Sequence, residues 1–123
     1  MTKFGKKYKL KSKKGIQSLF SNNKSLYIHP LRYLFNIYDD AENPGLKVMI
    51  SIPKRKMKNA VDRNYVRRQI REAIRINKGA LIEILDEKKK ILHLALIYNS
   101  TGQSTTKEIE RLVKKGFKLL ISN

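Results

Sequence analysis

The chain of 123 residues has the length of a single domain, enough for one hydrophobic core but not for two independent ones. Lysine and arginine number 28 against 10 aspartate and glutamate residues, so the formal net charge is +18. This excess is larger than solubility requires and destabilises a compact chain by self-repulsion, so it predicts a polyanionic partner, either nucleic acid or an anionic membrane surface. Cysteine is absent, which excludes a disulfide scaffold and a thiolate zinc site.

Two further classes of protein fit the sequence poorly. No apolar run approaches the roughly 20 residues needed to span a bilayer, and the first residues lack the apolar stretch of a signal peptide, so we expect a cytoplasmic protein without a membrane partner. The only histidines are His29 and His93, and their spacing does not suggest the acid–base pair of a protein nuclease. His29 precedes Pro30 and is typical of a turn, whereas His93 lies in an apolar run typical of a strand.

The N-terminal part of the chain is strongly basic. Residues 1–14 contain seven lysines and no acidic residue, with too few apolar positions to fold alone. We therefore expect residues 1–11 to form a partly mobile tail and residues 12–123 to form a single domain. Ser12 is a candidate N-cap for a short helix that ends near residues 21–23. The apolar residues at helical spacing in it are Ile16, Leu19 and Phe20.

Two β-strands are predicted after this helix. In residues 31–38 every second side chain is apolar or aromatic, which is the pattern of a strand with one buried face. Those side chains are Leu31, Tyr33, Phe35 and Ile37. A second strand is predicted at residues 47–52, where apolar side chains again alternate. Because residues 39–45 between them contain Asn-Pro-Gly, a strong turn signal, we expect the two strands to form an antiparallel hairpin.

A long helix is predicted after a basic loop. Residues 54–58, which follow the second strand, contain four cations. Asn59 is a candidate N-cap, and the carboxylate of Asp62 would complement the helix dipole in the first turn. We expect this helix to extend over residues 59–77, with Gly79 close to its end.

The rest of the chain is predicted to form helix, strand and helix. A short separate helical segment is expected at residues 81–85, before a turn at the three lysines of residues 88–90. Residues 91–98 are almost all apolar, which favours a buried strand. Thr105 or Thr106 then caps an amphipathic helix. Its apolar side comprises Ile109, Leu112, Val113, Phe117 and Leu120.

The long helix has two chemically different faces. At about 100° per residue, one stripe is apolar and another, about 100° wide, is cationic. The apolar stripe comprises Val66, Ile70, Ala73 and Ile74, and the cationic stripe comprises Asn64, Arg67, Arg68, Arg71 and Arg75. A planar guanidinium can grip a phosphate with two hydrogen bonds and can stack on a base, so the cationic stripe favours RNA as the partner.

Two other interpretations of the cationic stripe are weaker. A solvated face usually intersperses both signs of charge, whereas residues 54–78 contain ten cations and only two acidic residues, Asp62 and Glu72. A helix lying on a membrane surface would carry tryptophan, phenylalanine or leucine opposite its cations, whereas this helix carries valine, isoleucine and alanine.

The segment from Lys58 to Ala73 resembles the signature of the bacterial ribonuclease P protein subunit. That family carries Arg-Asn-Arg, one variable residue, Lys/Arg-Arg, and then Arg-Glu, and this chain has Arg-Asn-Tyr-Val-Arg-Arg followed by Arg-Glu. The resemblance extends over nearly the whole chain, from the basic N-terminus to the C-terminal helix. Tyr65 stands where the family usually has its third arginine, and Ile16 stands where it commonly has phenylalanine.

The resemblance implies a fold, a partner and a set of contacts. It implies an α/β protein with a mostly antiparallel sheet flanked by helices, and an unusual left-handed βαβ crossover that includes the arginine-rich helix. It also implies that the protein assists a catalytic RNA, whose bound Mg2+ supports the hydrolysis, in removing the 5′ leader of precursor tRNA. The residues expected to bind the catalytic RNA are Lys54, Arg55, Lys56, Arg63, Asn64, Arg67, Arg68 and Arg71. The isolated protein is expected to be monomeric, with no catalytic residue or metal site of its own.

By the same resemblance, a cleft between the N-terminal helix and the sheet holds the single-stranded leader. Phe20, Tyr33 and Phe35 are the candidates for its aromatic lining, and core packing is the competing role for them. Two other functions remain open from the residues alone. One is a ribosomal protein or RNA chaperone that takes no part in cleavage, and the other is a protein-only metal nuclease.

Overall fold

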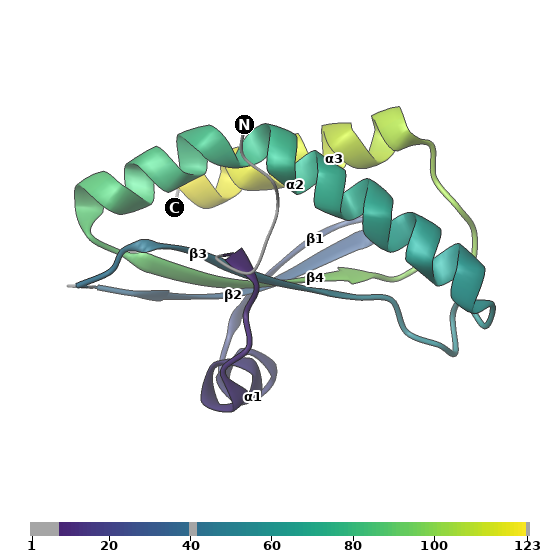
Figure 1. Cartoon of the computed structure of the whole chain (residues 1–123), viewed down its shortest axis with the longest axis horizontal. Helices are drawn as coiled ribbons and strands as arrows, with labels where there is room; N and C mark the ends of the chain where they lie inside the picture. Colours follow the sequence, from purple (N-terminus) through teal and green to yellow (C-terminus); the bar gives the residue numbers. More distant parts are fainter. Residues whose placement is uncertain (1–7, 40–41, 123) are drawn as a thin grey trace.

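The structure of the chain is a computed structural model that describes residues 8–39 and 42–122. Four strands form one sheet, in the spatial order β1, β2, β4, β3. The strands are β1 (Lys24–Ile28), β2 (Leu31–Tyr38), β3 (Gly45–Ser51) and β4 (Ile91–Tyr98), and the helices are α1 (Lys13–Ser21), α2 (Ala60–Lys88) and α3 (Thr106–Ser122). Helices α2 and α3 cover one face of the sheet, and α1 lies against the other (Figure 1). The expected class, a mostly antiparallel α/β fold, is confirmed.

The predicted hairpin between the second and third strands is wrong. Strand β4 lies between β2 and β3, pairing antiparallel with β2 and parallel with β3. Strand β4 can occupy this central place because it is apolar on both faces, as strands with two covered faces are. The backbone N–H of Gly45 donates to the carbonyl of Lys90 at 3.1 Å, which places the start of β3 beside the start of β4. Helix α2 is therefore the crossover between two adjacent parallel strands.

Strand β1 is absent from the sequence-based prediction. It pairs antiparallel with β2 across a turn at His29 and Pro30, whose peptide bond is cis. The turn expected at His29 is thus confirmed. The sequence pattern does not reveal this strand, because Lys-Ser-Leu-Tyr-Ile alternates only weakly between polar and apolar residues. The strand lies at the edge of the sheet, where most of it is exposed.

Helix α2 is longer than predicted. Its start is confirmed, because the side-chain carbonyl of Asn59 accepts a hydrogen bond from the N–H of Val61 at 2.9 Å. The helix does not end near Gly79 but continues to Lys88, and it terminates at Lys89, whose φ of 53° is left-handed. Leu81 and Leu85 are buried in register with the earlier apolar stripe. Burying two leucines outweighs the roughly 1 kcal/mol cost of one glycine inside a helix.

The described part of the N-terminal segment contacts the sheet and α2. Residues 1–7 of the predicted tail lie outside the described residues, whereas Lys9 bridges to Val48 on β3 and Leu10 is buried. The ammonium of Lys78, on α2, lies 5.0 Å from the ring centroid of Tyr8. The short helix that follows is confirmed, since the Ser12 hydroxyl caps α1 by accepting from the Gly15 N–H at 3.1 Å.

The sheet has a core on each face. The larger core lies beneath α2 and α3 and includes the predicted apolar stripes of both helices, and the smaller core lies beneath α1. The buried residues of the smaller core are Leu10, Leu19, Leu34 and Ala95. Since successive residues of a strand point to opposite faces, Leu31, Tyr33 and Phe35 of β2 contribute to the larger core and Leu34 contributes to the smaller one.

Helix α3 is fixed by contacts at its start and along its middle. The Thr105 hydroxyl accepts from the Glu108 N–H at 3.2 Å, so Thr105 rather than Thr106 is the cap. The buried hydroxyl of Tyr33 donates to the Leu112 carbonyl at 2.8 Å, and burial raises the pKa of Tyr33. The Tyr33 ring lies directly against Gly116, where no side chain separates helix from sheet. The outer face of α3 is consequently held in one orientation.

Candidate nucleic-acid interface

The basic loop between β3 and α2 is held in a defined conformation. The carbonyl of Pro53 accepts hydrogen bonds from the N–H groups of Lys56 and Met57, at 3.0 and 3.2 Å. Met57 is buried in the larger core and anchors the loop from below. Lys54 and Arg55 are exposed on the outside of this turn, so their charges face solvent on a fixed backbone.

Arg63 connects this loop to helix α2. Its guanidinium donates to the carbonyls of Met57 and Lys58, at 2.9 and 2.8 Å. Two backbone carbonyls would otherwise face solvent at this bend, and the planar guanidinium satisfies both. Arg63 was expected to contact RNA, and the structure shows that part of its hydrogen-bonding capacity is used within the protein.

The cationic side chains on the outer face of α2 differ in whether they already have hydrogen-bond or ion-pair partners within the protein. Arg68 and Arg71 are exposed, and neither has a hydrogen-bond or ion-pair partner among residues 8–39 and 42–122. Arg67 donates to the side-chain carbonyl of Asn64 at 3.1 Å. Arg75 pairs with Glu72, and this hydrogen bond lowers the pKa of the Glu72 carboxyl below its usual range.

The predicted inward face of α2 is confirmed. Val66, Ile70, Ala73 and Ile74 are all buried. Gln69 is also buried, and its amide donates to the carbonyl of Ser104 at 3.0 Å and to the hydroxyl of Thr106 at 3.2 Å. These bonds tie the arginine-bearing part of α2 to the start of α3.

Tyr65 lies on the outer surface of α2. Its side chain is 45% exposed, and Val61, one turn earlier, is 73% exposed. A half-exposed aromatic ring beside free guanidinium groups can stack on an unpaired base without a charge of its own. Tyr65 thus presents an accessible aromatic ring at the position where the family usually has arginine.

The three aromatic residues predicted to line one cleft are not brought together. Tyr33 and Phe35 are buried in the larger core, on the face of the sheet covered by α2 and α3. Phe20 is 50% exposed on α1, which lies against the opposite face. Tyr33 and Phe35 therefore pack in the core and do not line a leader-binding cleft.

The face beside α1 carries other exposed side chains instead. Tyr27 of β1 is 52% exposed and pairs in register with Arg32 of β2, which is also exposed. The Tyr27 hydroxyl is hydrogen-bonded to Nδ1 of His29 at 2.7 Å. The alternation of side chains in residues 31–38 could have indicated this surface. The odd-numbered positions are apolar and face the larger core, so even-numbered positions such as Arg32 lie on the opposite face.

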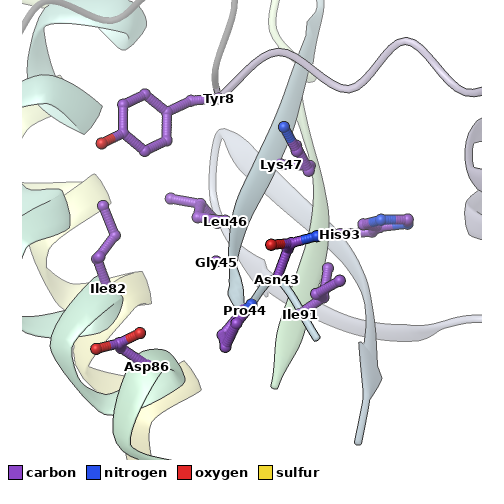
Figure 2. Close-up of a pocket in the computed structure, with 10 residues that line it drawn as sticks. All are labelled: Tyr8, Asn43, Pro44, Gly45, Leu46, Lys47, Ile82, Asp86, Ile91 and His93. Atoms are coloured by element: carbon purple, nitrogen blue, oxygen red, sulfur yellow. The ribbon is translucent and has the colours of Figure 1, made fainter. Parts of the chain in front are cut away.

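A separate cavity of about 310 Å³ lies at the beginning of β3. Figure 2 shows Ile82 and Asp86 of α2 beside this end of the strand, with His93 of β4 among the other lining residues. None of the residues predicted to bind RNA lines it. Nδ1 of His93 is buried and has no hydrogen-bond partner among the described residues, and the His93 ring lies edge-on to Tyr38.

His93 should make the stability of the protein sensitive to pH. Burial, together with the charge of Lys47, lowers the pKa of His93 below its usual range. Below the ordinary histidine pKa of about 6.5, the unfolded chain binds a proton that the folded chain resists. We therefore expect the free energy of unfolding to fall between pH 7 and pH 5. Urea denaturation of wild-type protein and a His93→Asn variant at both pH values measures this, and an equal fall in the two proteins would contradict it.

The described part of the chain contains neither a cluster of metal ligands nor a membrane-spanning helix. No group of three or more histidine, cysteine, aspartate or glutamate side chains there is placed to hold a metal ion. None of the helices in residues 8–39 and 42–122 is long and apolar enough to cross a membrane.

The fold and this surface define a class of small basic α/β proteins in which a cationic helix crosses between parallel strands. A profile of the family described as Ribonuclease P matches residues 4–120. The chain belongs to the ribonuclease P protein family.

Individual relatives agree with this assignment. The ribonuclease P protein components of two Porphyromonas gingivalis strains are each 27% identical over 108 residues, covering 88% of this chain and 79% of theirs. The solved ribonuclease P protein of Staphylococcus aureus superposes with a TM-score of 0.71 at 20% identity, covering 92% of this chain and 94% of that one. For the Thermotoga maritima protein the TM-score is 0.61 at 22% identity, with coverages of 94% and 96%. At these identities the structural likeness shows the fold.

Proposed function

We propose that this chain is the protein subunit that assists a catalytic RNA in removing the 5′ leader of precursor tRNA. The observation that carries the proposal is the fixed cationic surface of α2 and its preceding loop, within a chain that belongs to the ribonuclease P protein family. In this proposal the RNA and the Mg2+ bound to it carry out the hydrolysis. The protein contributes binding and positioning.

The catalytic RNA is proposed to contact the loop and the outer face of α2. Lys54 and Arg55 present positive charge on a turn that Met57 and Arg63 fix, and Arg68 and Arg71 extend that charge along the helix. Phosphate contacts of this kind supply affinity without reading the base sequence. The arrangement suits a folded RNA whose backbone passes over both elements.

The 5′ leader is proposed to bind beside α1, on the opposite face of the sheet. Phe20 and Tyr27 offer exposed rings for stacking, and Arg32 offers a cation for a phosphate. Stacking tolerates any base, which a leader of variable sequence requires. These three residues replace the predicted combination of Phe20 with Tyr33 and Phe35.

Alanine at Tyr27 or Phe20 should weaken the binding of precursor tRNA to the assembled enzyme by roughly 1–3 kcal/mol. Mature tRNA, which has no leader, should bind wild-type and variant enzymes equally. Both side chains are half-exposed, so the melting temperature should change little. Phe35→Ala is the contrasting variant, because it removes a buried ring and should destabilise the fold by about 3–5 kcal/mol. Equal loss of affinity for both tRNAs would argue against leader binding at this face.

A cleavage assay tests the function as a whole. Purified protein should raise the rate of precursor-tRNA cleavage by its cognate catalytic RNA at low Mg2+ concentration, where repulsion between the two RNAs is least screened. Protein that binds the catalytic RNA but leaves cleavage unchanged would indicate a structural RNA-binding protein instead. Cleavage by protein free of RNA would indicate a protein nuclease.

A further inference from the structure

Helix α3 carries a basic stripe on its outer face. At about 100° per residue, four cations spaced by four, three and four residues fall within an arc of roughly 60°. They are Lys107, Arg111, Lys114 and Lys118, and all four are exposed. The buried residues of α3, which include Ile109 and Gly116, lie on the other side of the helix. The stripe therefore points directly away from the sheet.

The stripe has the charge pattern of a binding surface and not of a solvated face. Solvated helices usually alternate the two signs, and such pairs contribute a few tenths of a kcal/mol each. The described residues form two ion pairs, Arg75 with Glu72 and Lys90 with Asp39, and neither involves a residue of α3. Glu108 and Glu110 belong to the same helix, yet within residues 8–39 and 42–122 no ion pair joins either of them to a cation of the stripe.

The stripe also has a fixed position relative to the arginines of α2. Gln69 of α2 bonds to Thr106 at the start of α3, while Leu85 and Leu120 line a common small pocket at the other end. The two helices thus run side by side in the same direction on one face of the sheet, as Figure 1 shows. Since Arg68 and Arg71 lie about 100° and 160° around α2 from Gln69, a polyanion that contacts both basic surfaces crosses the outer face of α2.

We propose that the basic stripe of α3 is a second contact for the catalytic RNA, formed with the phosphate backbone of a helical segment. This inference rests on the proposed function, because its partner is the same RNA. The stripe extends for roughly 16 Å at 1.5 Å per residue, long enough to face several phosphates of one RNA strand. It lies on the opposite side of the sheet from the proposed leader surface, which favours the catalytic RNA over precursor tRNA as its partner.

The first experiment measures how salt affects the binding of the protein to catalytic RNA alone, with no precursor tRNA present. The variant Arg111→Gln/Lys114→Gln should reduce the slope of log affinity against log salt concentration by about 1.4–1.8, corresponding to 0.7–0.9 per lost phosphate contact. The matched control is Lys88→Gln/Lys89→Asn, which removes two exposed charges at the end of α2 and keeps a residue that tolerates the left-handed conformation of residue 89. The control should change the slope by less than about 0.4.

The second experiment uses the absence of cysteine from the chain. A single Lys114→Cys variant, labelled with a photo-crosslinker, should attach to the catalytic RNA in the assembled enzyme, at nucleotides distinct from those reached from Arg68→Cys. The crosslink should form equally with and without precursor tRNA. A crosslink that forms only to precursor tRNA would reassign the stripe to that partner and overturn the proposal.

The outcomes separate this inference from the proposed function. If wild-type protein fails to bind the catalytic RNA, the proposed function itself is wrong. If wild-type protein binds, but the Arg111→Gln/Lys114→Gln variant keeps the wild-type slope and residue 114 gives no crosslink, the stripe is a solvated face. Circular dichroism of the variant checks that both glutamines leave α3 folded.

Discussion

Replacing Arg68 and Arg71 together with glutamine should weaken binding of the catalytic RNA at low salt and reduce the salt slope by about 1.4–1.8. Both side chains are exposed and have no hydrogen-bond or ion-pair partner within the described residues. Each substitution should therefore remove one phosphate contact without disturbing the fold. The loss of affinity should shrink as the salt concentration rises, because the wild-type protein loses its own contacts to competing ions. Filter binding or fluorescence anisotropy across a salt series measures the slope.

Two comparisons make this result interpretable. Lys88→Gln/Lys89→Asn removes the same charge elsewhere on α2, so it reports the effect of net charge alone. Arg63→Gln should behave differently, because it removes hydrogen bonds to the carbonyls of Met57 and Lys58 and should lower stability as well as affinity. If Arg68→Gln/Arg71→Gln leaves the slope at the wild-type value, α2 does not contact RNA through these arginines.

Replacing Gly116 with alanine should destabilise the protein by about 3 kcal/mol, with a fall in melting temperature of roughly 10 °C. A Cβ at this position would overlap the ring of Tyr33. The ring cannot move aside easily, because it is fully buried and its hydroxyl donates to the Leu112 carbonyl. Thermal unfolding followed by circular dichroism measures the change.

Gly79→Ala is the matched control for this prediction. Gly79 lies within α2, and beyond the neighbouring backbone of the helix itself a Cβ there would meet no atom of the described residues within 4 Å. Alanine is the better helix former, so this variant should be stabilised by roughly 0.5–1 kcal/mol. A double variant, Gly116→Ala/Tyr33→Leu, should be less destabilised than the sum of its two single changes, because the smaller side chain leaves room for the added methyl group. Strict additivity would mean that the ring is not the obstacle.

Local signals in the sequence predicted most of the individual elements. Ser12, Asn59 and Thr105 each cap a helix as expected, because capping depends on a side chain and the backbone a few residues away. The apolar stripe of α2 and the buried strand β4 are likewise confirmed, since periodicity reports burial directly. These features need no knowledge of the rest of the chain.

Strand pairing could not be predicted in the same way. The turn signal at Asn43-Pro44-Gly45 is compatible with a hairpin, yet β4, more than forty residues further along the chain, pairs with β2 and β3 and separates them. The choice depends on which strand gains most by being covered on both faces, a property of the whole sheet. The end of α2 was not predictable from Gly79 for a similar reason. The helix continues past this glycine because Leu81 and Leu85 become buried against the rest of the fold.

The candidate site was predicted in part. The cations of the loop and α2 could be assigned to the surface from the sequence, because charged side chains are rarely buried and those of α2 lie outside the apolar stripe of the helix. The aromatic residues could not be assigned by type alone, since Tyr33 and Phe35 are as suitable for a core as for stacking. Both residues lie an even number of positions from Leu31 in the same strand, so they share its face of the sheet and point into the larger core.

The bonds from Arg63 to the basic loop have a consequence for the thermodynamics of RNA binding. A loop that is ordered only by its ligand loses conformational entropy when it binds, at about 1–2 kcal/mol for each residue whose backbone becomes fixed. Here Arg63 and Met57 fix the backbone that carries Lys54 and Arg55 in the free protein. Association then orders few residues beyond the side chains themselves, which favours a rapid encounter steered by charge over slow folding on the RNA surface.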